Sequence, residues 1–270
     1  MPCPDPIRTE RSLSSCAAAL RLSRDASPAR RSSSASAESD AAISVGALVV
    51  LILGSILRYD RDQYSWRSGS SQLLRRKQLV WGSVLFHVGV IVIFFGHLIG
   101  LLTPIAIFDA LGISHGAKQV LAIVAGGIAG VMAIIGASLL VHRRLFDPRV
   151  RANSSTSDTL IIILLWVQLA LGLATIPISM QHLDGEEMVR FMSWAQGIFT
   201  FQGDAASHVA HVSIIFKAHL VLGLTILLLF PFTRLVHMLS VPLRYFWRPG
   251  YQVVRERNRR AAPVRLPAGE

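Results

Sequence analysis

Five long apolar segments dominate this sequence and limit what it can fold into. An α-helix rises about 1.5 Å per residue and the hydrocarbon core of a bilayer is about 30 Å thick, so about 20 apolar residues cross it. Each segment is long enough, or nearly so, and polar stretches separate them. The sequence therefore predicts an all-α integral membrane protein, a bundle of five transmembrane helices. The predicted spans are Ala41–Leu57, Leu79–Leu102, Gln119–Val141, Thr159–Met180 and Val212–Leu239.

The composition supports a chain that faces lipid. Hydrophobic residues make up 52% of the 270 residues and charged residues only 16%, whereas soluble domains carry about 25% charged residues. A high positive net charge, here +11, is also typical of nucleic-acid-binding proteins. In membrane proteins, however, Lys and Arg collect in cytoplasmic loops. We therefore expect a lipid membrane and no nucleic acid as partner.

The chain divides into three parts. Residues 1–40 contain ten serines and no periodic apolar face, which is typical of a disordered tail or of a start-site artefact. Residues 41–243 hold the five predicted spans and form the membrane domain. Residues 244–270 form a basic tail, which we expect on the cytoplasmic side.

Basic residues are distributed unevenly among the loops. The first loop, the third loop and the C-terminal segment are rich in Arg, whereas the second loop has only Lys118 and the fourth has more acidic than basic residues. Because short cytoplasmic loops carry an excess of Lys and Arg, we expect the N-terminus outside and the C-terminus in the cytoplasm. Arg143 and Arg144 of the third loop are interpreted as determinants of this topology.

Four histidines fall inside predicted spans, and no Asp or Glu does. His87 and His97 share the second span, and His219 and His237 the fifth. A polar side chain at membrane depth is costly, and for a single His a hydrogen bond across the bundle explains it well. Two pairs on two helices without carboxylates instead favour haem iron, because two neutral imidazoles suit a six-coordinate electron-transfer site.

The expected depth of each histidine in the membrane indicates which two form a pair. The second span runs outward and the fifth inward, so His97 pairs with His219 near the outside and His87 with His237 near the cytoplasm. The spacings give partial support: His219 and His237 are 18 residues apart, about five helical turns, whereas His87 and His97 are ten apart and about 80° out of line. We expect Pro231 to bend the fifth span between its ligands.

The positions of the two cysteines indicate that such a cofactor is not attached covalently. Cys3 and Cys16 both lie in the N-terminal tail, and there is no Cys-x-x-Cys-His sequence. A disulfide framework and covalent haem attachment are thus excluded. We expect two non-covalent haem b groups, with the four histidines as axial ligands to iron.

Several blocks of the sequence resemble the gamma subunit of respiratory nitrate reductase, a membrane-bound di-haem cytochrome b. The resemblance runs from about residue 50 to residue 256, and its blocks are LRYDRDQYSWRSGSSQLL, LFHVGVIVIFFGHLIGLLTP, HRRLFDPRVRA, TIPISMQHLDGEEM and HLVLGLTILLLFPFTRLVHMLSVP. It implies that the residues matching His97 and His219 bind the outer haem, and those matching His87 and His237 the inner haem. The family begins with an aromatic-rich first helix, from which this chain departs.

The resemblance also implies an activity and partners. The chain would be the quinol-oxidising subunit of a quinol:nitrate oxidoreductase in the bacterial inner (plasma) membrane, with menaquinol or ubiquinol as substrate. Electrons would pass from the outer to the inner haem, then to an iron–sulfur (beta) subunit and a molybdenum (alpha) subunit that reduces nitrate in the cytoplasm. Protons would be released outside.

A quinol site is expected beside the outer haem. The family has a lysine that helps to bind quinol, and it aligns with Lys118 in the second loop; reaching the lipid headgroups is the other role for such a lysine. Gly96 beside His97 leaves room for a planar ring. His182, also on the outer face, is a further candidate for lining this site.

Three other functions compete with this interpretation. The nearest is a di-haem, quinone-linked anchor of a sulfite- or heterodisulfide-type reductase complex. A proton-coupled transporter, with His97 and Lys118 relaying protons, would be colourless when purified. A purely structural anchor would tolerate replacement of all four histidines.

Overall fold

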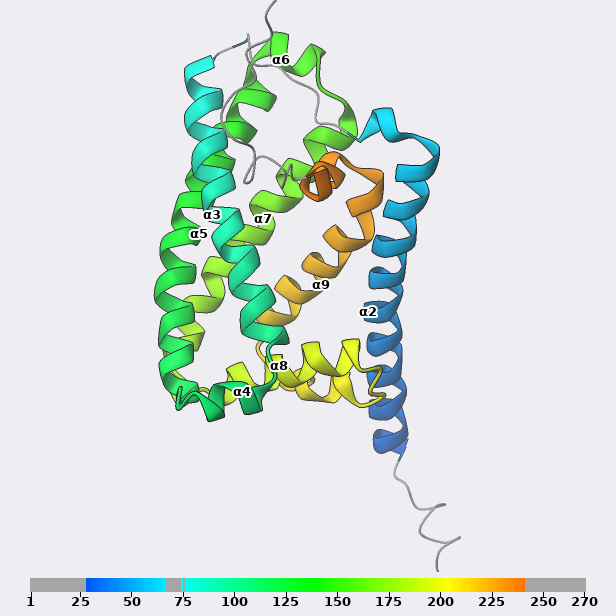
Figure 1. Cartoon of the computed structure of the whole chain (residues 1–270), viewed down its shortest axis with the longest axis vertical. Helices are drawn as coiled ribbons and strands as arrows, with labels where there is room; N and C mark the ends of the chain where they lie inside the picture. The colour runs from blue at the N-terminus through cyan, green and yellow to red at the C-terminus, as the bar shows by residue number, and fades with distance from the viewer. Residues whose placement is uncertain (1–27, 67–73, 75, 241–270) are drawn as a thin grey trace, which may run out of the picture.

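The helices of this computed structural model run alternately up and down a single bundle (Figure 1). The structure describes residues 28–66, 74 and 76–240; both predicted tails, apart from residues 28–40, lie outside this part of the chain. No strand occurs among the described residues. Five helices are long and apolar enough to cross a membrane, which confirms the predicted fold class. Their candidate spans are Ala42–Arg61, Arg76–Leu102, His115–Phe146, Thr156–Ser179 and Ile214–Phe232.

Short helices close the two ends of the bundle. The long helices are α2 (Pro28–Arg61), α3 (Arg76–Leu102), α5 (His115–Phe146), α7 (Thr156–Ser179) and α9 (Ile214–Leu229). At one end, α4 (Ile105–Ala110) and α8 (Glu186–Phe199) lie across the bundle, and α6 (Pro148–Ala152) lies at the other (Figure 1). We call these the α8 end and the α6 end. From the basic loops we expect the α6 end to face the cytoplasm and the α8 end to face the outside.

Polar residues at the helix starts explain where the apolar segments are interrupted. Ser114 and Ser155 are the N-caps of α5 and α7, and their hydroxyl groups accept hydrogen bonds from the backbone N–H groups of Ala117 and Asp158. The Asp147 carboxylate caps α6 in the same way. The first N–H groups of a helix have no partner within it, so these side chains stabilise the ends.

Small residues allow α3 and α5 to pack closely. A Cβ atom added at Gly89 would lie 2.5 Å from the Ala129 carbonyl oxygen, and one at Gly136 would collide with the backbone of Phe86. Ala133 between them is fully buried. Such stripes of small residues bring helix backbones together inside membranes, where dispersion contacts drive association. Helix α3, which carries His87 and His97, is therefore held tightly to α5.

The fifth apolar segment is not one continuous helix, so the predicted span Val212–Leu239 is wrong at its end. Helix α9 stops at Leu229 and is followed by two short 3-10 helices, η3 (Phe230–Phe232) and η4 (Arg234–Ser240), with Thr233 extended between them. Pro231 has no N–H group to continue the helical ladder. His219 on α9 and His237 on η4 consequently do not share one helix face.

The first helix is longer than predicted. Residues 28–40, which we expected to belong to a disordered tail, are helical and continue directly into the first span. Pro28 suits a first helical position, and the three alanines and the one glutamate among residues 29–40 favour helix. Residues 1–27 lie outside the described part of the chain, so the expectation for them is unchanged.

Candidate functional site

The structure brings together the same two pairs of histidines that we expected from their depths. The ring of His97 on α3 faces that of His219 on α9, with 6.3 Å between the ring centroids. His87, nearer the start of α3, faces His237 on η4 at the same centroid distance of 6.3 Å. The first pair lies toward the α8 end and the second toward the α6 end. The break after Leu229 therefore does not prevent His237 from meeting His87.

This separation suits two imidazoles that share one metal ion. An imidazole nitrogen binds a transition metal at about 2.0–2.1 Å and lies about 1.1 Å from the centre of its ring, so two rings on opposite sides of one ion are separated by roughly 6 Å. The described residues contain no group of three or more His, Cys, Asp or Glu that could hold a metal ion. Two imidazoles alone do not complete a coordination sphere, whereas a haem supplies four further nitrogens itself.

Backbone carbonyl groups orient three of the four rings. The Nδ1 atom of His87 lies 2.7 Å from the Ser83 carbonyl oxygen, and that of His97 lies 2.9 Å from the Ile93 carbonyl oxygen. The Nδ1 atom of His237 is in the same way hydrogen-bonded to the Arg234 carbonyl oxygen. A carbonyl only accepts, so Nδ1 carries the hydrogen and Nε2 keeps its lone pair for a metal.

Helix α7 positions the fourth ring, that of His219. The Gln168 side-chain amide donates to the His219 carbonyl oxygen at 3.1 Å and lies 3.4 Å from the ring Nε2. A Cβ atom at Gly172 would be only 3.0 Å from the ring. The His219 Nδ1 atom has no hydrogen-bond partner among the described residues. Our sequence reasoning missed Gln168, although a lone amide within an apolar span is a usable signal.

The side of α3 beside His97 is open. A Cβ atom added at Gly96 or at Gly100 would meet no other atom within 4 Å, and the side chains of His87 and His97 are exposed. A flat macrocycle or a quinol ring could therefore approach the α3 backbone here. Gly96 thus has the open surroundings that the predicted quinol site requires.

Lys118 is not in a loop, as we had expected, but lies within α5 and is only 7% exposed. Its ammonium group donates to the Gly100 carbonyl oxygen and to the Met192 sulfur, both at 2.8 Å, and lies 3.7 Å from the centroid of the Phe108 ring. Burial excludes the alternative that this lysine reaches for lipid headgroups. Gly100 follows His97 by less than one turn, so the charge lies at the same end of α3 as the His97–His219 pair.

Helix α8 completes the surroundings of Lys118, and the sequence reading missed it. Its buried residues Met192, Ala195 and Ile198 recur every three residues, a spacing that indicates an amphipathic helix. The Gln196 side-chain amide also donates to the Leu101 and Thr103 carbonyl oxygens, both at 3.0 Å. Helix α8 is thereby fastened to the end of α3, against Lys118.

The segment between α7 and α8 is fastened to the start of α5. The Gln119 side chain is buried and donates to the carbonyl oxygens of Ser179 and His182. Gly185, at φ +86°, leaves no space for a Cβ atom beside His115. The His182 side chain itself is exposed. Its predicted part in a quinol pocket remains a prediction.

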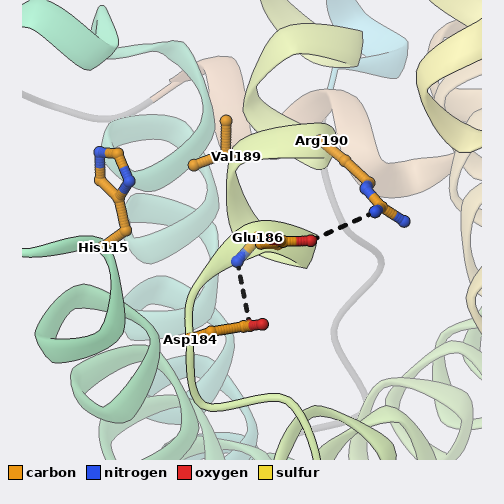
Figure 2. A pocket seen from close by; sticks show the side chains of 5 residues that line it. All are labelled: His115, Asp184, Glu186, Val189 and Arg190. Carbon is orange, nitrogen blue, oxygen red and sulfur yellow. Dashed lines mark hydrogen bonds and ion pairs between the residues drawn. The ribbon is translucent and has the colours of Figure 1, made fainter.

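A shallow pocket lined mainly by charged and polar residues lies at the α8 end (Figure 2). His115 and Val189 face one another across it, while Glu186 accepts a hydrogen bond from Arg190 at 3.4 Å and its backbone N–H donates to Asp184 at 3.2 Å. The His115 ring also pairs with Asp109 at 3.0 Å. These charged groups satisfy one another, and the pocket does not include Lys118.

The arginines of the α6 end are packed into the protein more than expected. Arg143 is only 2% exposed and donates to the Leu74 carbonyl oxygen at 2.7 Å, and Arg144 pairs with Asp158 at 3.6 Å. They lie within α5 rather than in a loop. Their positive charges remain compatible with a role in topology, but they also stabilise the fold.

The five candidate spans and the two facing histidine pairs define an all-α integral membrane protein with two imidazole pairs between its helices. Comparison with known proteins then identifies the family. The model of the nitrate reductase gamma subunit family matches residues 45–257, and the chain belongs to this family.

Individual relatives agree with this assignment. The chain is 51% identical over 209 residues to the respiratory nitrate reductase 1 gamma chain of Escherichia coli (strain K12), an alignment that covers 77% of this chain and 92% of that protein. The identity and coverage are the same for the respiratory nitrate reductase 2 gamma chain of that organism. The nitrate reductase gamma chain of Bacillus subtilis (strain 168) is 40% identical over 211 residues, with 78% and 94% covered. The resemblance seen in the sequence is confirmed, and the protein is a membrane subunit of an oxidoreductase complex.

Proposed function

We propose that this subunit oxidises quinol near the α8 end and passes the electrons toward the α6 end. The observation that carries this proposal is the presence of two imidazole pairs, each with ring centroids 6.3 Å apart, at two levels of one helix bundle. His97 and His219 would hold an outer haem b, and His87 and His237 an inner haem b. Bound haem would supply one-electron transfer at each level.

The chain's own residues account for the quinol site. Lys118 has three N–H donors, of which two are directed at Gly100 and Met192, so one is left to donate to a quinol oxygen. Gly96 leaves space beside His97 for a planar ring. Met192 of α8 and the Phe108 ring lie against the ammonium group, and Lys118 is only 7% exposed. The substrate that fits this combination is a flat, lipid-soluble quinol such as menaquinol or ubiquinol.

The proposed orientation gives the reaction a direction. With the α8 end outside, quinol oxidation releases protons outside while electrons move inward. Moving one charge across the membrane is worth about 2.3 kcal/mol per 100 mV, so this route conserves energy. At the α6 end the partners would be the iron–sulfur (beta) and molybdenum (alpha) subunits of nitrate reductase, with nitrate reduced in the cytoplasm. The membrane would then be the bacterial inner membrane.

Single replacements of the four histidines test this function. His97→Ala or His219→Ala should remove the outer haem and spare most of the inner one, while His87→Ala or His237→Ala should do the reverse. The measurement is a reduced-minus-oxidised spectrum of the purified complex together with extracted haem per chain. Haem should leave in acid–acetone, because no covalent attachment sequence exists.

His142 provides the matched control. It lies on α5 at the α6 end, where its ring contacts Phe146 and Gln78 rather than another histidine. His142→Ala should therefore keep both haems. A colourless wild-type protein would contradict the proposal and favour a transporter, and loss of a single haem on replacing His87 and His219 together would contradict the pairing.

A further inference from the structure

The guanidinium group of Arg58 is hydrogen-bonded to the turn between η3 and η4, where the fifth helix is interrupted before His237. In α2, Arg58 Nη1 donates to the Pro231 carbonyl oxygen at 2.7 Å and to the Thr233 carbonyl oxygen at 2.8 Å. Its Nε and Nη2 atoms donate to the hydroxyl and carbonyl oxygens of Ser65, at 3.1 and 3.0 Å. The end of α9 leaves carbonyl groups without helical partners, and Arg58 satisfies two carbonyls of the η3–η4 turn.

A second residue of α2, Gly54, lies against Pro231 in the same interruption of the helix. A Cβ atom at Gly54 would lie 2.8 Å from the Pro231 Cγ atom, closer than two carbon atoms can pack without displacement. Gly54 and Arg58 are four residues apart, so they share one face of α2. Leu51, on this face too, packs against the buried cluster that includes Phe230 and Val236. In this contact Arg58 supplies the hydrogen bonds, and Gly54 leaves the space that Pro231 occupies.

The break determines where His237 lies. Thr233 is extended (φ −118°, ψ 178°), and this single non-helical residue turns the chain into η4. The ring of His237 then faces His87 at 6.3 Å. The rings of His87 and His237 are hydrogen-bonded to the Ser83 and Arg234 carbonyl oxygens, whereas Arg58 is bonded to Pro231 and Thr233. An effect of Arg58 on this pair would therefore act through the turn.

We propose that Gly54 and Arg58 form a clamp on the η3–η4 turn and are positioning residues for the His87–His237 pair. This inference rests on the function proposed above, because its readout is the inner haem. Arg58 thereby has a local structural role beyond its contribution to the positive charge of the first loop. The first helix, which lacks haem ligands, sets the geometry of one haem site.

Two variants of different chemistry test the clamp in the full complex. Arg58→Gln removes the charged donors, and Gly54→Ala adds one methyl group against Pro231. We expect the inner haem to dissociate about tenfold faster, a typical consequence of losing support for a metal ligand. The measurements are haem transfer to apomyoglobin and the low-spin EPR signal of each haem, with the outer haem unchanged. Arg58→Lys should restore the inner signal in part, because one ammonium group can still reach a carbonyl.

Matched controls lie on the same helix. A Cβ atom at Gly46 meets nothing within 4 Å, and Arg61 is exposed at the end of α2, so Gly46→Ala and Arg61→Gln should behave as wild type. The clamp is overturned if both test variants keep a normal inner haem, or if they weaken both haems equally. If His87→Ala and His237→Ala also keep all haem, the proposed function itself is wrong. If they lose the inner haem while Arg58→Gln and Gly54→Ala both keep it, only the clamp is wrong.

Discussion

At the scale of single residues, Lys118 is the charged group whose surroundings say most about function. A backbone carbonyl, a thioether and an aromatic face surround its ammonium group, and no carboxylate is bonded to it among the described residues. A cation buried without an anion is costly. Such a group is typical of a site that binds a polar ligand, and under the function proposed above this ligand would be a quinol oxygen.

Replacing Lys118 should slow quinol oxidation specifically. Because Lys118→Ala removes the donor but not the histidine pairs, we expect haem reduction by quinol to slow at least about 100-fold, as when a positioned donor to a reacting oxygen is lost. Nitrate reduction from an artificial donor that feeds the soluble subunits should change little. Stopped-flow haem spectra and nitrate assays check the two rates.

The control for this variant is Lys217→Ala, which removes a lysine at the same end that donates to the Ala210 carbonyl oxygen. It should oxidise quinol normally. A normal quinol rate in Lys118→Ala would place the site elsewhere.

At the scale of elements, the contact between α3 and α5 supports both histidines of α3. Gly89→Ala would place a methyl group against the Ala129 carbonyl oxygen, and such overpacking costs about 1–3 kcal/mol. We expect a lower melting temperature of the detergent-solubilised protein, followed by tryptophan fluorescence.

Gly126→Ala is the matched comparison, since a Cβ atom there meets nothing within 4 Å. Alanine favours helix over glycine by about 0.8–1.0 kcal/mol in soluble hosts, so this variant should melt at or slightly above the wild-type temperature. The packing interpretation fails if Gly89→Ala melts as high as Gly126→Ala.

At the scale of the whole molecule, the orientation of the bundle is open to a direct test. Gly203 follows α8, and Asn153 ends α6 at the opposite end; both are exposed. With Cys3 and Cys16 replaced by Ser, we expect Gly203→Cys to react with a membrane-impermeant maleimide in spheroplasts and Asn153→Cys to react only after lysis. Labelling in the reverse order would invert the proposed direction of electron flow.

The basic C-terminal segment provides a second test at this scale. Residues 244–260 carry six arginines, lie outside the described residues, and follow η4 and the proposed inner haem. Truncation after Leu243 should release the soluble subunits and leave haem content nearly intact, as measured by co-purification and haem assay. Truncation after Arg260 keeps these arginines and should retain the subunits. Stoichiometric co-purification of the shorter protein would refute docking through this segment.

The sequence by itself determined the features that depend on local composition and depth. Apolar length predicted five spans, because a helix in lipid must satisfy its backbone internally and cross a fixed thickness. Histidine position predicted which rings would meet, since only side chains at the same depth of one bundle can face one another across it. The expected pairs, His97 with His219 and His87 with His237, are the neighbouring rings.

Only the tertiary structure decided features that depend on contacts between distant segments. The burial of Lys118 requires α8, which is 74 residues away at Met192. The turn at Thr233 is bonded to Arg58, which lies 175 residues earlier, so the end of the fifth helix could not be placed from its own apolar pattern. Hydrogen bonds to backbone carbonyls leave no periodic signal in a sequence, because any residue supplies the carbonyl, and which one is reached depends on the packing of the whole bundle.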